Sequence, residues 1–391
     1  MALMTLALLG SLMLAFASLS RTEPVIAANH LRAAQARALA ESGLEYALWA
    51  LSHPAHPAGL PSPLPGALAA APFDGRTFVA LRAGGFTVEV RNDAGSDPQR
   101  RTVTAVGWVP SNSAADLRPK AHRMVTVDVV AVPQLGARAP CALCVKGALT
   151  IAGNVTIDGR NADAGCGDDA KYGALSGSAT TITGAATLSG GGGASGQQQP
   201  ADVFEPVTLS AAALEALRTL AWRHGTYYGP GFPRGGTVSD GGTTWPGRVT
   251  FDAANPVPDG VIFVDTIEGR DVAAGGSPSL AEARFDAGAF GARADGFRGW
   301  IIVNGSMEIA AGLNVRGLVY AVDALTYRAS DPGRIEGLAI SLNVRGASSS
   351  RIEAVGAADV AIRFDCGHAG APGLVPHGFL PIPGTYREDD D

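Results

Sequence analysis

The chain begins with a long segment whose apolar positions have the spacing of a helix. No charged residue occurs before Arg21, and the preceding residues are mostly Leu, Ala and Met. Further along, Leu44, Leu48 and Leu51 recur at steps of four and three, which is the spacing of one face of a helix. The pattern predicts a single helix from residue 1 to about residue 51, apolar at its start and two-sided later.

The first part of this predicted helix is long enough for a transmembrane and assembly role. About 20 apolar residues cross a bilayer as a helix. Large apolar side chains in this part are expected to be exposed, because their partners would be lipid or other subunits. A bend is expected near Pro24, whose ring removes a helical hydrogen bond. The candidate membrane and assembly residues are Leu3, Leu6, Leu9, Leu12, Leu14, Phe16 and Pro24.

Three interpretations of the N-terminal segment remain open. The first is a cleavable secretory signal, since Ala15-Phe16-Ala17 resembles a cleavage site; against it, no basic region leads the apolar run and the helical pattern continues past the site. The second is a single-span anchor with a stalk. The third is a prepilin whose short basic leader would precede Met1, which would also reconcile the downstream Arg21 and Arg32 with the positive-inside rule.

A proline-rich linker and four alternating segments follow the helix. The linker covers residues 54–72, where prolines stop the helix and favour extended chain. Period-two alternation with many β-branched residues then predicts strands at 77–82, 86–91, 101–108 and 123–132. Turns are expected between these strands. Residues 73–134 are therefore expected to form a pilin-like antiparallel sheet, covered on one face by the end of helix 1–53 in an α+β unit.

Short strands separated by glycine dominate the rest of the chain. Residues 145–159 align with 303–317, residues 151–159 resemble 182–190, and Leu-Asn-Val-Arg-Gly occurs at 313–317 and 342–346. Self-similarity of this kind indicates stacked strands, so residues 135–386 are expected to form a glycine-rich, β-helix-like β-solenoid head, with a β-sandwich as the alternative. A helical insertion is expected at about 208–224, and residues 387–391 read as a frayed acidic tail.

Composition narrows the functional class. Charged residues make up 17% of the chain and the net charge is −6, which gives no reason to expect nucleic acid as a partner. The His residues are scattered, and no H-E-x-x-H motif occurs. With abundant glycine and proline, the composition is that of a globular, turn-rich protein of the exported type.

The order of these parts, together with one local motif, resembles the PilX-like family of type IV pilus and pseudopilus assembly proteins. The motif is Ala40-Glu41-Ser42-Gly43-Leu44-Glu45, which is similar to a segment common in such helices; the glycine-punctuated segment at 146–159 and the Leu-Pro-Ile-Pro-Gly-Thr-Tyr-Arg-Glu ending are also similar. The resemblance implies a minor pilin-like subunit that enters or primes a filament through its helix. Thr5 stands where major pilins usually carry Glu, which favours a role at the tip.

The chain contains four cysteines. Because the cysteines of exported proteins are usually oxidised, structural disulfides are expected. Cys141 and Cys144 form a C-x-x-C motif, but residues three apart in a regular strand face opposite sides. The preferred pairing therefore links Cys141 and Cys144 separately to Cys166 and Cys366. Redox activity and zinc binding by the C-x-x-C motif are the less favoured alternatives.

The case for enzymatic chemistry is weak. Carboxylates crowd one loop, at Asp158, Asp163, Asp168 and Asp169, without the EF-hand order, and a solvated turn is the preferred interpretation. A β-solenoid is also similar to the fold of polysaccharide lyases, which need a carboxylate cluster for Ca²⁺ and a catalytic Arg or Lys on one face. The side chains that such a site would recruit are Asp323, Asp331, Arg316 and Arg345, but nothing in their spacing requires catalysis. No enzyme activity, no cofactor and no metal are expected.

The sequence therefore predicts a non-enzymatic minor pilin-like subunit in type IV pilus or pseudopilus assembly. Its expected place is the bacterial inner membrane as a single-pass protein, with the head in the periplasm or on a cell-surface filament. Its expected partners are other pilins or pseudopilins, the pilus assembly machinery and the inner membrane. The alternative is a membrane-stalked surface adhesin or carbohydrate-binding β-solenoid protein, with a surface or glycan ligand for the head.

Overall fold

The computed structural model describes the chain except for residues 1, 55, 62–63, 93–98, 133–134, 162–170, 192–198, 232–244, 273–278, 292, 294, 372, 376–377 and 390–391, and except for the side chains of 2–3, 6–7, 14–22 and 137. The described chain divides into two compact units. The first unit contains Met1–Ala131 and Gly378–Asp391, and the second contains Val132–His377.

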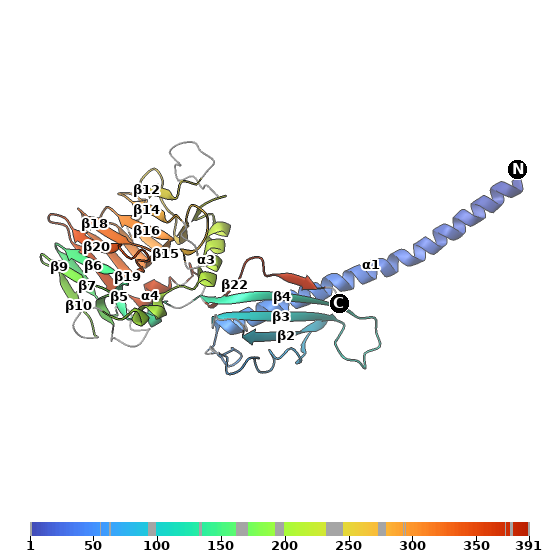
Figure 1. Cartoon of the computed structure of the whole chain (residues 1–391). Coiled ribbons are helices and arrows are strands. Elements are labelled where there is room, and N and C mark those ends of the chain that lie inside the picture. The colour runs from blue at the N-terminus through green and yellow to red at the C-terminus, as the bar shows by residue number, and fades with distance from the viewer. Residues whose placement is uncertain are drawn as a thin grey trace. The chain divides into compact units, whose positions relative to one another are not determined.

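The first unit combines one helix with an antiparallel sheet. Helix α1 runs from Ala2 to Ser52 and continues through Pro24. Figure 1 shows that its N-terminal half extends beyond the sheet. Sheet 1 is ordered β1-β2-β3-β4-β22, and β23 also pairs with β4. Its strands are β1 (Val79–Leu81), β2 (Gly84–Asn92), β3 (Arg100–Val109), β4 (Ala121–Val132), β22 (Gly378–Pro381) and β23 (Arg387–Asp389).

The C-terminal end of the chain belongs to this first unit, which differs from the expected head and tail. Residues 378–386 were expected in the head, but β22 pairs with β4, and the backbone N–H of Ile382 donates to the carbonyl of Asp128 at 2.8 Å. Residues 387–389 were expected to fray, but they form β23, antiparallel to β4. The pairing satisfies backbone groups that a free tail would leave to water.

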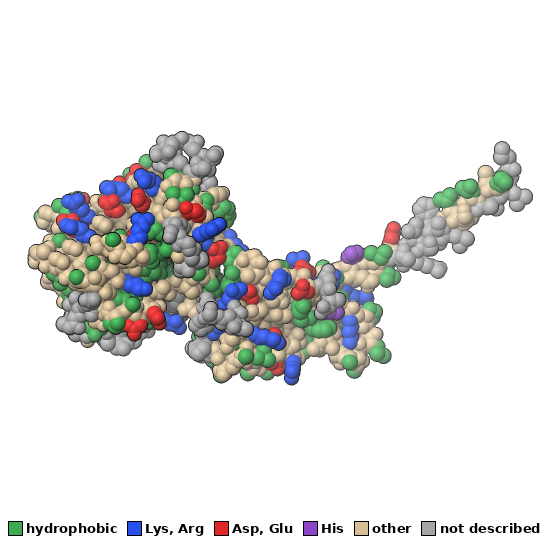
Figure 2. Space-filling view, viewed as in Figure 1, with side chains coloured by type: hydrophobic (Ala, Val, Ile, Leu, Met, Phe, Trp, Pro, Cys, Tyr) green, Lys and Arg blue, Asp and Glu red, His purple; other side chains and the backbone are tan. Residues whose placement is uncertain are grey.

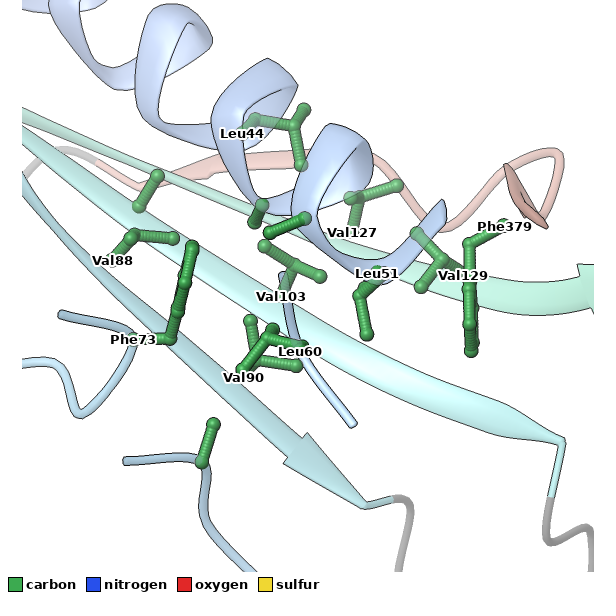
Figure 3. Close-up of a cluster of buried hydrophobic side chains, with 14 of the residues drawn as sticks. Leu44, Leu51, Leu60, Phe73, Val88, Val90, Val103, Val127, Val129 and Phe379 are labelled. Carbon is green, nitrogen blue, oxygen red and sulfur yellow. The ribbon is translucent and has the colours of Figure 1, made fainter. Parts of the chain in front are cut away.

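The core of the first unit lies between the C-terminal half of α1 and sheet 1 (Figure 3). Alternate residues of β3 are buried, as the sequence alternation predicts. The helix approaches the sheet closely because glycines occur on both sides. A Cβ at Gly43 would lie 2.9 Å from Phe86, and one at Gly107 would lie 2.0 Å from the carbonyl oxygen of Ala36.

The second unit is built from parallel strands in two sheets. Sheet 2 contains β5 (Cys141–Val145), β7 (Val155–Asp158), β8 (Tyr172–Ser176), β10 (Thr187–Ser189), β11 (Tyr227–Tyr228), β13 (Gly260–Val264), β15 (Phe297–Val303), β17 (Asn314–Ala321), β19 (Gly333–Ser341) and β21 (Val360–Phe364). Sheet 3 contains β12 (Arg248–Phe251), β14 (Ala281–Phe285), β16 (Gly305–Ile309), β18 (Leu325–Ala329), β20 (Ser349–Ala354), β6 (Ala148–Ala152) and β9 (Thr180–Thr183).

Short helices accompany these sheets. They are α2 (Leu135–Arg138), the 3₁₀ helix η2 (Ala201–Val207), α3 (Ala211–His224) and α4 (Cys366–Gly370). Helix α3 forms within the expected helical insertion. The Ser210 side chain caps its N-terminus by accepting a hydrogen bond from the N–H of Ala213, and Gly225 ends it in the left-handed conformation. Both are the standard end signals of a helix.

The parallel strands are stacked in an order that differs from their order in the chain. Strands β19, β20 and β21 pair with β5, β6 and β7, whose paired residues lie 196 to 205 positions earlier in the chain. Two of the sequence repeats are structural. Ile151 lies opposite Ile182 in the repeat between 151–159 and 182–190. Residues 145–159 and 303–317 each run from the end of one strand of sheet 2, through a strand of sheet 3, into another strand of sheet 2. The repeated Leu-Asn-Val-Arg-Gly is not structural, because residues 314–317 lie within β17, whereas residues 342–346 follow the end of β19.

A row of glycines crosses sheet 2. Gly299, Gly317 and Gly337 lie opposite one another on β15, β17 and β19. Each has a positive φ, of 138°, 151° and 140° respectively. A Cβ at Gly317 would lie 1.8 Å from the carbonyl oxygen of Gly299. Only glycine fits these positions, because the conformation and the close stacking both exclude a side chain.

The predicted fold class is wrong. The sequence favoured an α+β unit with a pilin-like antiparallel sheet, followed by a β-solenoid. The structure has more residues in strands than in helices, and its second unit is built on two sheets of parallel strands. The physical reason is that alternation of apolar residues identifies strands but not their partners, so the long-range parallel pairings could not be read from the sequence.

The predicted localisation is also contradicted. Within the described residues, no helix combines the length and apolarity that crossing a membrane requires. The described side chains near the start of α1 include the polar or small residues Thr5, Gly10 and Ser11 beside the apolar ones. The expectation of a single-pass inner-membrane protein, with the inner membrane as a partner, is corrected accordingly.

Candidate functional site

The N-terminal part of α1 carries a group of exposed apolar side chains. Leu9 is 62% exposed and Leu12 is 45% exposed, and Met4, Leu8 and Met13 are exposed as well. At 3.6 residues per turn these five side chains point over about half of the helix circumference. Leaving a Leu side chain in water rather than buried costs about 1.5–3 kcal/mol. The surface is therefore suited to contact with other apolar groups.

The remaining predicted residues of this surface divide into two groups. Leu3, Leu6, Leu14 and Phe16 belong to α1, but their side chains lie outside the described residues. Pro24 is inside the helix and its side chain is exposed. Further along, Val25, Ile26 and Leu31 are exposed too, so apolar exposure continues past Pro24. The expectation of exposed apolar side chains is confirmed at Leu9 and Leu12.

The motif at 40–45 has a different role from this exposed surface. Ala40, Gly43 and Leu44 are buried against sheet 1, whereas Glu41 and Glu45 are exposed. Glu41 accepts a hydrogen bond from Arg37, one turn earlier, at 3.1 Å. The motif thus holds the C-terminal half of α1 on its own sheet, and the N-terminal half is the part left for other contacts.

The cysteines pair differently from the prediction. Cys141 and Cys144 form a disulfide with each other, with their Cα atoms 5.6 Å apart. Three steps of regular strand would separate these atoms by about 10 Å, so the backbone is contracted here and the assumption of a regular pleat fails. Cys366, at the start of α4, is also disulfide-bonded, and Cys166 lies outside the described residues. The predicted separate links of Cys141 and Cys144 are wrong.

The acidic loop near β7 provides one described carboxylate. Asp158 is paired with Arg160 at 2.6 Å, and hydrogen bonds from Arg160 lower the pKa of this carboxyl. Asp163, Asp168 and Asp169 lie outside the described residues. Among the residues that are described, no three His, Cys, Asp or Glu side chains gather into a group that could hold a metal ion.

The four residues considered for a lyase site do not form one cluster. Asp323 is buried and accepts hydrogen bonds from Ser306 Oγ at 3.0 Å and from the N–H of Arg345 at 3.2 Å. Arg316 instead lies on sheet 2, where its Nε donates to Glu336 at 3.1 Å. Asp331 accepts a hydrogen bond from its neighbour Ser330. Asp323 and Arg345 are therefore brought together, and Arg316 belongs to another surface.

A buried ionic network that the sequence analysis missed joins α3 to the end of β13. Arg218 of α3 donates to Asp265 and to Asp271, at 2.6 Å each. Asn304 Nδ2 donates to the same two carboxylates at 3.0 and 3.1 Å, and the Tyr227 hydroxyl donates to Asp265 at 3.0 Å. The residues are distant in sequence and share no motif spacing, so no sequence signal identified them.

In this network one cation, Arg218, pairs with the buried carboxylates of Asp265 and Asp271 and with the more exposed carboxylate of Glu215. Burial raises the pKa of Asp271, and the attraction of Arg218 offsets this only in part. Burial alone would lower the pKa of Arg218, but Asp265 and Asp271 together raise it. Burial, followed by the charge of Asp265, raises the pKa of Tyr227. Because the charged groups are paired with one another, the network is suited to fixing α3 on sheet 2.

A polar groove crosses the outer face of sheet 3. It has a volume of about 380 Å³ and is lined by outward side chains of β12, β14, β16 and β18. Opposite charges face each other across the strands, with Arg248 and Glu282 at 3.8 Å and Arg284 and Glu308 at 2.8 Å. Figure 2 shows basic and acidic side chains interleaved where Figure 1 labels these strands. The alternation of Glu282 and Arg284 within one strand was the available sequence signal.

No protein-family model matches the chain, and no curated protein matches it. The chain is similar to the crystal structure of the competence-associated pilin ComZ from Thermus thermophilus, with 14% identity and a TM-score of 0.24, over 92% of this chain and 97% of that one. A TM-score this low does not show a shared fold or a shared function. The narrower resemblance to the PilX-like family receives no support from these comparisons.

Proposed function

We propose that this chain is a non-enzymatic, pilin-like subunit that assembles with other pilin-like chains through the N-terminal part of α1. The observation that carries the proposal is the exposure of Leu8, Leu9 and Leu12 on a continuous helix. A helix with apolar side chains around much of its circumference is stabilised when other apolar groups surround it. Neighbouring helices of the same kind would provide such surroundings.

The division of α1 into two halves supports this role. Its C-terminal half is held by its own sheet through Ala36, Ala40 and Leu44, so the free half is presented on a fixed base. No charged residue precedes Arg21, and similar helices can therefore pack side by side without burying an unpaired charge, which would be costly. The proposed partners are other pilins or pseudopilins and the machinery that assembles them.

A pair of matched substitutions tests the proposal. Leu9→Asp introduces a charge into the exposed apolar surface, and Leu117→Asp makes the same change at a 95% exposed residue outside α1. The two proteins are produced in the native host, and the share recovered with sheared filaments is measured. We expect Leu117→Asp to match the unaltered protein and Leu9→Asp to be lost from the filament fraction. Equal recovery of both variants, at equal protein levels, would contradict the proposal.

The groove on sheet 3 favours a second candidate function, the binding of a glycan by the second unit. Its lining includes the hydrogen-bonding side chains of Arg284, Glu308 and Thr326, which match the hydroxyl groups of sugars. Binding of oligosaccharides to the full chain, measured by calorimetry and compared with Arg284→Ala, tests this function. The same mixtures analysed for shortened glycans, with and without Ca²⁺, test the proposed lack of enzyme activity.

A further inference from the structure

One end of sheet 3 leaves its apolar interior open. One of the inward-facing rows of this sheet takes one residue from each strand, in register. The row consists of Phe251, Phe285, Ile309, Tyr327, Ile352, Ile151 and Ile182. Its other members are buried, but Ile182, on the last strand β9, is 45% exposed. Within the described part of the chain, the interior of the stack therefore ends at Ile182, whose side chain is only partly covered.

The backbone of β9 presents an open edge beside this side chain. The carbonyls of Ala179 and Thr183 accept hydrogen bonds from Leu149 and Gly153, so these groups face β6. Residues of a parallel strand alternate in the side to which their backbone groups point. The N–H and C=O of Ile182 therefore point away from β6, toward the edge. Such an edge can accept a further strand.

The sequence of this end offers no protection against pairing. No residue from Tyr172 to Ala201 is charged, and none from Tyr172 to Gln199 is proline. Natural sheet edges usually carry Lys, other charges or proline, which prevent contact with another edge. The side chains of β9 are Thr and Ile, which favour extended pairing. Two copies of this edge can approach each other without burying any charge.

The opposite end of the stack is closed. On sheet 2 the terminal strand β11 has both of its residues, Tyr227 and Tyr228, buried, and α3 is fixed there by Arg218. On sheet 3 the terminal strand β12 begins with Arg248, whose side chain is 74% exposed. A second copy cannot add its open edge to this protected end. The surface that complements the open edge of β9 is therefore the β9 edge of a second copy.

We propose that two copies of this chain associate through β9, edge to edge, with their Ile182 side chains covering each other. Joining the same edge of both copies requires a twofold axis, which makes the two β9 strands antiparallel. Such an interface uses each open end once, so it closes at a dimer and does not propagate. The interface does not involve α1, and it is independent of the proposed assembly through that helix.

The test measures self-association separately from the contacts of α1. The parent protein is the full chain with Leu9→Asp, which weakens helix association, and its mass is followed by analytical ultracentrifugation over a range of concentrations. We expect a dimer. We expect Ile182→Lys to raise the dissociation constant at least about tenfold, because the charge would be buried. Leu117→Lys, the control at an exposed apolar residue, is expected to leave the dimer unchanged.

A second measurement does not depend on the Lys variant folding. Ile182→Cys in the same parent lies near the middle of β9, so a short bismaleimide is expected to link two copies into a covalent dimer. The same reagent is expected to leave Leu117→Cys monomeric. A parent that is monomeric at every concentration, a growing series of larger species, or a dimer unaffected by Ile182→Lys and not linked through Ile182→Cys would overturn the proposal.

Discussion

Phe251 and Ile182 lie at opposite ends of the same inward-facing row in sheet 3, and their exposures differ completely. Phe251 is 0% exposed, whereas Ile182 is 45% exposed. Both side chains point to the interior, because each lies in register with inward neighbours. The difference therefore reflects what covers each end of the stack, and it has consequences for stability as well as for association.

The first prediction compares two isoleucines of this row. Ile309 is fully enclosed between neighbouring strands, so Ile309→Ala is expected to lower the free energy of unfolding by about 2–5 kcal/mol. Ile182→Ala removes the same atoms from a half-covered position, and its cost is expected to be less than half as large. Urea unfolding of both variants, monitored by Trp fluorescence, checks the difference. Equal losses would show that Ile182 is covered.

The second prediction concerns the glycine row of sheet 2. Gly317→Ala would place a Cβ 1.8 Å from the carbonyl oxygen of Gly299, at a residue with φ of 151°. The strain is expected to lower the free energy of unfolding by more than about 3 kcal/mol. Gly346→Ala is the control, because its Cβ would meet no atom within 4 Å. Its effect is expected to stay within about 0.5 kcal/mol, as measured from urea midpoints.

The third prediction concerns the pH dependence of stability at the Arg218 network. Burial raises the pKa of Asp271 in the folded protein. Its contribution is therefore fully present below the ordinary pKa of an aspartate and is lost as the pH rises through the folded value. Asp271→Asn removes this titration. Relative to the variant, the unaltered protein is expected to lose stability as the pH rises above about 4, the ordinary pKa of an aspartate.

Asp158 supplies a control of opposite sign. Hydrogen bonds from Arg160 lower its pKa, so its contribution is present above the ordinary value and is lost as the pH falls. Asp158→Asn is expected to reduce the loss of stability in acid, and Asp271→Asn the loss toward neutral pH. Urea midpoints measured at a series of pH values separate the two. Parallel shifts in both variants would contradict this assignment.

Local elements of the fold were predictable from the sequence, and their partners were not. The apolar spacing identified a helix that the structure places at Ala2–Ser52, and Ser210 and Gly225 marked the ends of α3. These signals act within a few residues. The pairing of β19 with β5 joins Ile340 to Cys144, a contact set by packing across the whole unit, and no local pattern specifies it.

The candidate site shows the same division. Exposure of Leu9 followed from an apolar helix with no obvious partner in the chain. The Cys141–Cys144 disulfide was missed because the strand was assumed to be regular, whereas the Cα atoms are 5.6 Å apart. The Arg218 network and the open edge at Ile182 depend on which strands end each sheet. Neither could be predicted without knowing the order of the strands in the two sheets.

The central claim is that the N-terminal part of α1 contacts other subunits in an assembled filament. The most direct measurement places a photo-activated cross-linking amino acid at position 9, and separately at position 117, and illuminates intact filaments. The account predicts covalent products between this chain and a second pilin-like chain from position 9, and none from position 117. Filaments that contain the protein but give no such product from position 9 would contradict the claim.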